Sequence, residues 1–298
     1  MKKLGYIIYS LFGAGLVLTG FMTTEKGFKE NDRTELDRVA EDYKELGDMG
    51  FKGFCPTDYK VAFSSGEKDI VVDYNDGDYK VSERDAVYEG LVGSIYQNGD
   101  EFEVVVPEYD TWISIQAGSG EQLSSVIWHE SFHAYQNEYC KLYDKVDSAM
   151  LGETELSSEV DNNAEAKRLY EKELQILGQL ADEENSCDIH EIALEYISVA
   201  EERDNLLTDE INRSEAFYEM MEGSAYYVES HAVRYENGEQ VYRNNYLESA
   251  AEYKNGNSKY YSHGMLECML LDELNPEWKD SYSFDRTLDE VIEEYAVK

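Results

Sequence analysis

Residues 128–136 read WHESFHAYQ and place His129, Glu130 and His133 in the spacing H-E-x-x-H. On a helix, side chains four positions apart lie one above the other, so the two histidines would present their imidazoles from one face. Two adjacent imidazole nitrogens are a common half of a zinc site. Glu130 would lie one step around the helix, where its carboxylate can reach a metal-bound water without binding the metal. The pattern predicts a Zn²⁺ site with a general base beside it.

A catalytic zinc ion usually takes three protein ligands and keeps one position open for water. The stretch YEMMEGSAYYVES at 218–230 offers three glutamates as the third ligand, and three histidines elsewhere are alternatives. The residues alone leave the choice open among these six: Glu219, Glu222, Glu229, His190, His231 and His263.

These segments resemble the gluzincin metallopeptidases, in which the third zinc ligand is a glutamate on a second helix. The aminopeptidase N family has this glutamate in an N-E-G-F-A stretch, and MEGSA at 221–225 matches it at the glutamate, glycine and alanine. The same family has a Y-x-x-G helix whose tyrosine stabilises the transition state, and Tyr261 and Gly264 have that spacing. The resemblance implies a zincin-like fold, Glu222 as the third ligand and Tyr261 as a catalytic residue.

The chain departs from the aminopeptidases in two respects. More positions separate His133 from Glu222 than in ordinary members, so residues 147–213 would be an insertion. The chain also has no G-A-M-E-N stretch before the metal helix, the segment that grips the free amine of a substrate in those enzymes. This puts exopeptidase activity in doubt, and the layout is most similar to uncharacterised bacterial zincin-like proteins.

The predicted chemistry is hydrolysis of peptide or protein substrates. Glu130 would take a proton from the zinc-bound water as it attacks the peptide carbonyl, and then return it to the leaving amine. Tyr261 would donate a hydrogen bond to the oxyanion, with these alternatives: Tyr226, Tyr227, His231 and His263. Two other interpretations are a non-catalytic, metal-binding zincin-like scaffold and an acidic cell-surface interaction protein. The intact Glu130 favours the enzyme, because a pure metal binder has no need of a general base.

The elements that must position these residues follow from hydrophobic periodicity. Ser119 with Gln122 forms a capping-box pattern, which predicts a helix over 120–143. Its apolar neighbours place the histidines at a buried position or in a cleft. A short charged helix is expected at 33–47. Beyond residue 119 the apolar spacing is helical, with two or three long helices between 160 and 234.

Between residues 59 and 116, β-branched and aromatic runs alternate with turn clusters. They predict five strands, at 59–65, 69–74, 79–83, 101–106 and 112–116. The segment TWISIQ at 111–116 is expected to be either an edge strand that pairs with an extended substrate or a buried core strand.

The expected fold is α+β and zincin-like, with a strand-rich part at 58–118 packed on a mainly α-helical part at 119–298. We expect these two parts to form one metallopeptidase domain at 58–298. Before it we expect a signal anchor or signal peptide at 1–24 and a linker with a short helix at 25–57.

Charge and the N-terminus indicate partners and location. The chain has 26 Lys and Arg against 64 Asp and Glu, a net charge of −38. Such an acidic surface repels phosphates, which argues against nucleic acid as a partner. Lys2 and Lys3 precede an uncharged run that ends before Glu25, long enough at about 1.5 Å per residue to cross a bilayer as a helix.

Lysines before this run and an acidic body after it predict an extracytoplasmic protein, anchored in the membrane by residues 4–22 or secreted. Four cysteines would then meet an oxidising compartment, where three pairings are possible: Cys55, Cys140, Cys187 and Cys268.

Overall fold

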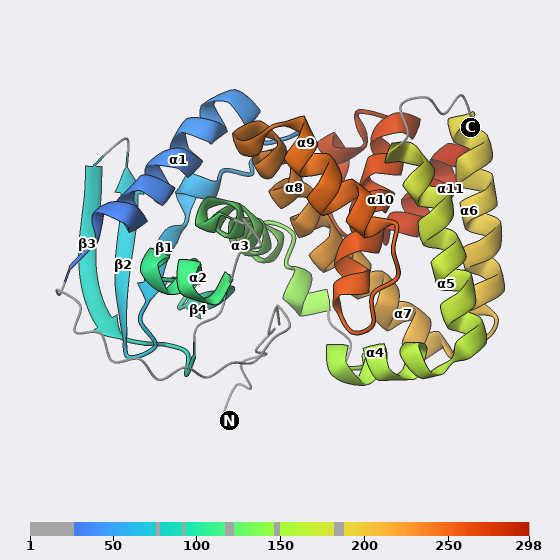
Figure 1. The fold of residues 1–298 in the computed structure, drawn as a ribbon, viewed down its shortest axis with the longest axis horizontal. Helices are drawn as coiled ribbons and strands as arrows, with labels where there is room; N and C mark the ends of the chain where they lie inside the picture. Colours follow the sequence, from blue (N-terminus) through green and yellow to red (C-terminus); the bar gives the residue numbers. More distant parts are fainter. Residues whose placement is uncertain are drawn as a thin grey trace. The chain divides into compact units, whose positions relative to one another are not determined.

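A computed structural model of the chain describes residues 27–75, 78–90, 93–116, 122–145, 150–181 and 188–297. The chain divides into two compact units (Figure 1). The first runs to Glu45 and resumes from Cys55 to Ala134, and the second comprises Leu46–Phe54 and the chain from Tyr135 onward. A five-stranded mixed sheet belongs to the first unit, and most of the helices belong to the second. The predicted α+β class is confirmed.

The sheet of the first unit has the strand order β3-β2-β1-β5-β4. Its strands are β1 (Lys60–Ser64), β2 (Lys68–Asn75), β3 (Asp78–Asp85), β4 (Ser94–Asn98) and β5 (Glu101–Pro107). β1 and β5 pair in parallel, and every other neighbouring pair is antiparallel. The middle strands are buried through β-branched and aromatic residues, whereas the edge strand β3 is mostly exposed and charged, which discourages pairing with other chains. Four of the five predicted strands are confirmed.

The fifth predicted strand is wrong, because residues 111–116 belong to the helix α2 (Tyr109–Gln116). Short apolar runs fit a helix or a strand equally well in sequence, and here the alternation does not follow burial. Trp112 is buried, while Ile113 and Ile115 are about half exposed. The backbone N–H of Tyr109 donates to Asp32 Oδ1 at 2.7 Å, which satisfies a donor of the first helical turn. This segment therefore offers no strand edge to a substrate.

The helix α3 (Leu123–Glu138) contains the H-E-x-x-H stretch, as predicted, although Ser119 lies outside the described residues. It is held at its start by α1 (Glu30–Leu46), which confirms the predicted charged helix. The Ser124 backbone N–H donates to Glu35 Oε2 at 2.9 Å, so a buried carboxylate satisfies one of the free donors of the first turn. Arg38 donates to Gln122 Oε1 at 2.7 Å just before it.

Helices dominate the second unit, and Figure 1 shows α5 and α6 running side by side. The α-helices are α4 (Glu153–Asn162), α5 (Ala164–Leu177), α6 (Ile189–Asp204), α7 (Asp209–Tyr218), α8 (Ser224–Asn237), α9 (Glu239–Tyr242), α10 (Ser258–Leu274) and α11 (Leu288–Ala296). Two π-helical turns, η4 (Glu219–Gly223) and η5 (Arg243–Glu248), connect some of them. The 3₁₀ turns of this unit are η2 (Leu142–Lys145), η3 (Gly178–Ala181) and η6 (Trp278–Ser281), and η1 (Pro56–Asp58) lies in the first unit.

The predicted two or three long helices between 160 and 234 are confirmed. The structure has three helical stretches there: α5, α6, and a stretch in which α7 continues through η4 into α8. Local capping sets where each stretch starts. Side chains of Asn163, Asp188 and Thr208 accept hydrogen bonds from the first turns of α5, α6 and α7, and each restarts a helix.

Residues 46–54 join the core of the second unit although they come early in the chain. Phe51 and Phe54 are fully buried. The ring of Phe51 lies 5.7 Å from that of Trp278, edge to face, and Phe54 lies 5.6 Å from Tyr135. These aromatic contacts tie the early segment to α3 and to the C-terminal part of the unit.

The predicted N-terminal anchor at 1–24 lies outside the described residues, as does Cys187. In the part of the chain that the structure describes, no helix is both long and apolar enough to span a membrane. Cys55, Cys140 and Cys268 are free thiols.

Candidate metal centre

His129 and His133 lie in the middle of α3, in a stretch that apolar neighbours bury. The two histidines are 3% and 5% exposed, and Ile127 and Phe132 are fully buried. The imidazole rings meet edge to face with centroids 4.8 Å apart, and their Nε2 atoms are 3.1 Å apart. At zinc–nitrogen distances of 2.0–2.1 Å, two ligands of a tetrahedral ion lie about 3.4 Å apart. The pair would need to open by only a few tenths of an ångström to hold such an ion.

Glu130 is also buried, with 3% exposure, and its carboxylate faces the start of β4. A Cβ atom at Gly93 would lie 2.9 Å from Glu130 Oε1 and 3.0 Å from Val126 Cγ1. The glycine therefore leaves the room that this carboxylate occupies. Burial, and to a lesser degree the charge of Glu130, raises the pKa of the Tyr88 phenol nearby. Sequence reasoning missed Gly93, because an isolated glycine before a short strand carries no distinguishing signal.

Glu222 lies on η4 in the second unit and is fully buried. Burial, and then the charge of Glu222, raises the pKa of Glu153 to about 8. The turn that carries Glu222 is fixed by Gln136, which belongs to the last turn of α3. Gln136 Nε2 donates to the Met221 carbonyl at 3.0 Å and to Ser224 Oγ at 2.9 Å. Single π-helical turns within helices are frequent at functional sites.

The other candidates for the third ligand have different surroundings. Glu219 and His263 belong to the same buried cluster, since Glu219 Oε1 lies 3.2 Å from His263 Nδ1. Glu229 accepts a hydrogen bond from the Tyr246 hydroxyl at 2.8 Å. His231 Nδ1 lies 2.9 Å from the Tyr227 carbonyl oxygen, and burial lowers the pKa of this imidazole. A separate candidate is exposed at the start of α6: His190.

Tyr261 is half-buried on α10, and its ring meets that of Tyr226 edge to face, with centroids 6.0 Å apart. Three residues later, Gly264 sits where α10 crosses η4 backbone to backbone. A Cβ atom at Gly264 would lie 2.8 Å from Gly223 Cα, and one at Gly223 would lie 2.6 Å from the Gly264 carbonyl carbon. The glycines of the two family-like motifs thus face each other, and both are required by this close approach.

Buried histidine and glutamate groups that could hold a metal ion occur among the described residues. Imidazole nitrogen with carboxylate oxygen is a donor set that suits zinc and other first-row divalent metals.

Comparison with known proteins gives no relative: no family model, no curated protein and no solved structure matches the chain. What the residues can do chemically therefore has to follow from their own geometry.

Proposed function

We propose that the chain is a zinc-dependent metallopeptidase of the gluzincin type, with a zincin-like fold. His129, His133 and Glu222 hold the ion, and Glu130 is the general base. The observation that carries this proposal is the pair of buried imidazoles on α3, with Nε2 atoms 3.1 Å apart and a buried carboxylate one residue further on. Two imidazoles and one carboxylate leave the fourth position for water, as in catalytic zinc sites.

The choice of Glu222 is supported by the way its turn is held. Gln136 follows His133 by less than one helical turn on the continuous helix α3. Its two hydrogen bonds reach the backbone just before Glu222 and the side chain just after it. A fully buried carboxylate also has a large desolvation cost, which coordination of a divalent ion would offset.

Zinc, when bound, lowers the pKa of its water from about 15.7 to near 7 and polarises the substrate carbonyl. Glu130 accepts the proton of that water and delivers it to the leaving amine. Tyr261 donates a hydrogen bond to the oxyanion. The burial of Glu130 keeps bulk water away from this proton, and the missing side chain at Gly93 leaves room for the carboxylate.

The substrate strand would add to β4 and not to residues 111–116, for which an edge strand was one of two expectations. β4 lies at the edge of the sheet opposite β3, and the strand follows directly after Gly93 beside Glu130. An extended peptide that pairs with this edge would pass the general base. Backbone pairing of this kind favours unstructured protein segments, and we propose that they are cleaved outside the cytoplasm by an enzyme that residues 4–22 anchor or export.

The test compares four forms of the full-length chain on casein as an unstructured substrate. Glu130→Gln should keep zinc and lower hydrolysis by about 10²- to 10⁴-fold, because the amide cannot accept a proton. His129→Ala should lose both zinc and activity. Glu138→Gln, exposed on the same helix, is the matched control and should match wild type. Wild-type turnover by Glu130→Gln would refute the mechanism, and a wild type that binds zinc but cleaves nothing would favour the metal-binding scaffold.

A further inference from the structure

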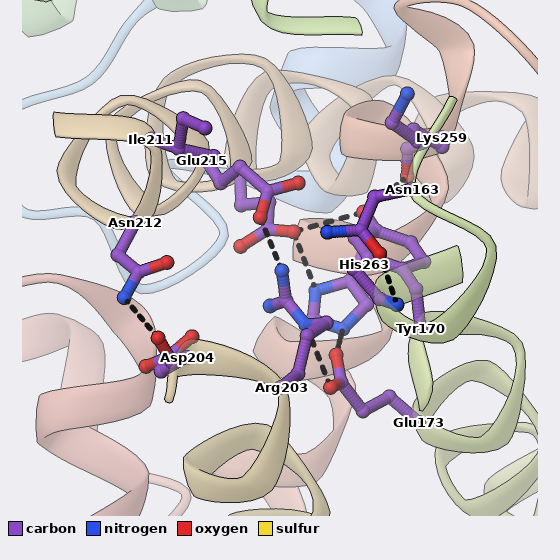
Figure 2. Close-up of polar contacts among 12 residues, drawn as sticks. Asn163, Tyr170, Glu173, Arg203, Asp204, Ile211, Asn212, Glu215, Lys259 and His263 are labelled. Carbon is purple, nitrogen blue, oxygen red and sulfur yellow. Dashed lines mark hydrogen bonds and ion pairs between the residues drawn. The ribbon is translucent and has the colours of Figure 1, made fainter. Parts of the chain in front are cut away.

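A second group of ionisable side chains is sealed inside the second unit, among α5, α6, α7, η4 and α10 (Figure 2). It contains four glutamates, one arginine and one histidine, none more than 4% exposed: Glu173, Glu215, Glu219, Glu267, Arg203 and His263. The proposed peptidase mechanism uses none of them. Burial of so many charges needs a physical reason, because each one costs several kcal/mol unless it is paired.

One side of this group is a well-formed ion-pair network. Arg203 Nε donates to Glu173 Oε1 at 2.8 Å, and another guanidinium nitrogen bonds Glu215. The other oxygen of Glu173 lies 3.2 Å from His263 Nε2, and a dashed line in Figure 2 marks this interaction. The Arg203 guanidinium and His263 hold the pKa of Glu173 below its usual value despite burial.

The other side of the His263 ring is different. Nδ1 lies 3.2 Å from Glu219 Oε1 and 3.7 Å from Glu267 Oε2. Among the described residues, neither Nδ1 nor Glu267 Oε2 has a partner with hydrogen-bond geometry. Donor atoms of the three side chains all lie within 4.8 Å of one another. The distances from His263 Nδ1 to the two carboxylate oxygens, 3.2 and 3.7 Å, lie on either side of the roughly 3.4 Å that separates two ligands of a tetrahedral zinc ion.

The surroundings of these three side chains match those of metal ligands. The Tyr170 hydroxyl donates to Glu219 Oε1 at 2.8 Å, and the Tyr196 hydroxyl donates to Glu267 Oε1 at 2.6 Å. His263 meets a carboxylate at its far nitrogen, Nε2. In metal sites, a ligating imidazole almost always donates its other N–H to a carboxylate, carbonyl or water, and ligating carboxylates accept further hydrogen bonds.

The group also carries excess negative charge, which a bound cation would neutralise. Four carboxylates face one guanidinium, and even a protonated His263 leaves two negative charges in excess. Lys259 offsets these charges only in part, since its Nζ also pairs with Asp161 Oδ1 at 2.9 Å. A divalent ion on a neutral His263 would neutralise Glu219 and Glu267 and leave the arginine network with one excess charge.

We propose that the second unit contains its own divalent metal site, with Glu219, Glu267 and His263 Nδ1 as ligands. One imidazole and two carboxylates suit Zn²⁺ or Mn²⁺. The ion would clamp η4 to α10 and through the tyrosines to α5 and α6. The site does not use the α3 histidines, so it can be tested separately from the peptidase proposal.

The experiment removes the α3 pair first. In full-length His129→Ala/His133→Ala, metal analysis after loading with Zn²⁺ should still find one equivalent, and Co²⁺ should give the visible d–d bands of a protein site. Adding Glu267→Gln to this background should abolish that equivalent, whereas Glu273→Gln, exposed on the same helix, should not. Tyr196→Phe should weaken metal affinity by about 10- to 100-fold while it keeps the ring in the core.

Two results would overturn the site: a double variant that retains neither Zn²⁺ nor Mn²⁺, or a bound ion that Glu267→Gln and Tyr196→Phe leave unchanged. The first would identify a metal-free network neutralised by protonation of Glu219, whose pKa burial raises to about 8. Circular dichroism of Tyr196→Phe shows whether the fold is kept if Glu267→Gln is insoluble. Failure of the peptidase proposal gives a different metal content. Wild type would then hold a single ion, and His129→Ala/His133→Ala would retain it.

Discussion

Replacement of Gly264 by alanine tests the backbone crossing that supports η4. The added Cβ atom would lie 2.7 Å from the Glu219 carbonyl carbon and 2.8 Å from Gly223 Cα, and it would be closer still to the Glu219 oxygen. Carbon atoms in favourable contact are about 3.5–4.0 Å apart, so α10 and η4 would have to separate by about 0.7 Å or more. All the obstructing atoms are backbone atoms, which cannot rotate away.

The expected loss of stability follows from two opposing effects. Overpacking a well-packed core typically costs about 1–3 kcal/mol, and contact with rigid backbone places this change at the upper end. Alanine in place of a helical glycine contributes about 1 kcal/mol in the opposite direction. The net destabilisation is about 2 kcal/mol, which for a unit of this size lowers the Tm by about 4–8 °C.

Thermal unfolding followed by circular dichroism measures this difference. Gly152→Ala is the matched control, because nothing lies within 4 Å of a Cβ atom there and its φ of −69° suits alanine. The control should unfold within about 2 °C of wild type. A Gly264→Ala variant that unfolds as late as the control would show that α10 and η4 do not cross at this distance.

Three further variants address the oxyanion donor, the buried network and pH. Tyr261→Phe should lower casein turnover by about 10²- to 10³-fold at unchanged zinc content, and an equal loss of zinc would show a structural role instead. Arg203→Met should destabilise the fold by about 3–5 kcal/mol in urea unfolding, because two buried carboxylates lose their partner, whereas the exposed Arg234→Met should cost less than about 1 kcal/mol. Burial raises the pKa of Asp32 from 3.8 to about 6, so its contribution to stability is full below pH 3.8 and is lost as the pH rises through 6. The Tm of Asp32→Asn should therefore gain on wild type between pH 4 and 7, unlike that of the exposed Glu41→Gln, and parallel Tm curves would contradict this pKa.

The metal helix could be predicted from sequence because its information is local. The spacing of His129 and His133 fixes a shared helical face, and the apolar residues around them fix burial. The segment 111–116 could not be assigned in this way. Its alternation suits a strand, but Trp112 is buried while Ile113 and Ile115 are about half exposed, and that depends on residues far away in the chain.

The second buried group shows the same limit more clearly. His263 lies 90 positions from Glu173, and in sequence each carboxylate of the group looks like one more member of an acidic surface. β4 was not predicted, for a simpler reason. Its sequence SIYQN at 94–98 is short and half polar, so it is a strand because it pairs with β5. The choice of Glu222 came from the resemblance, and it stays a prediction.

The early segment at 46–54 bears on how the molecule can be divided. The chain passes between the two units at residues 45/46, 54/55 and 134/135, so no single cut yields both units intact. A fragment that starts at Tyr135 would lack Phe51 and Phe54 and leave their places beside Trp278 and Tyr135 empty. At about 1.5–3 kcal/mol for each buried phenylalanine, the loss is about 3–6 kcal/mol in total, a large part of the roughly 5–15 kcal/mol by which folded domains are stable. A helical fragment for study in isolation would therefore need residues 46–54 supplied in trans or fused through a linker.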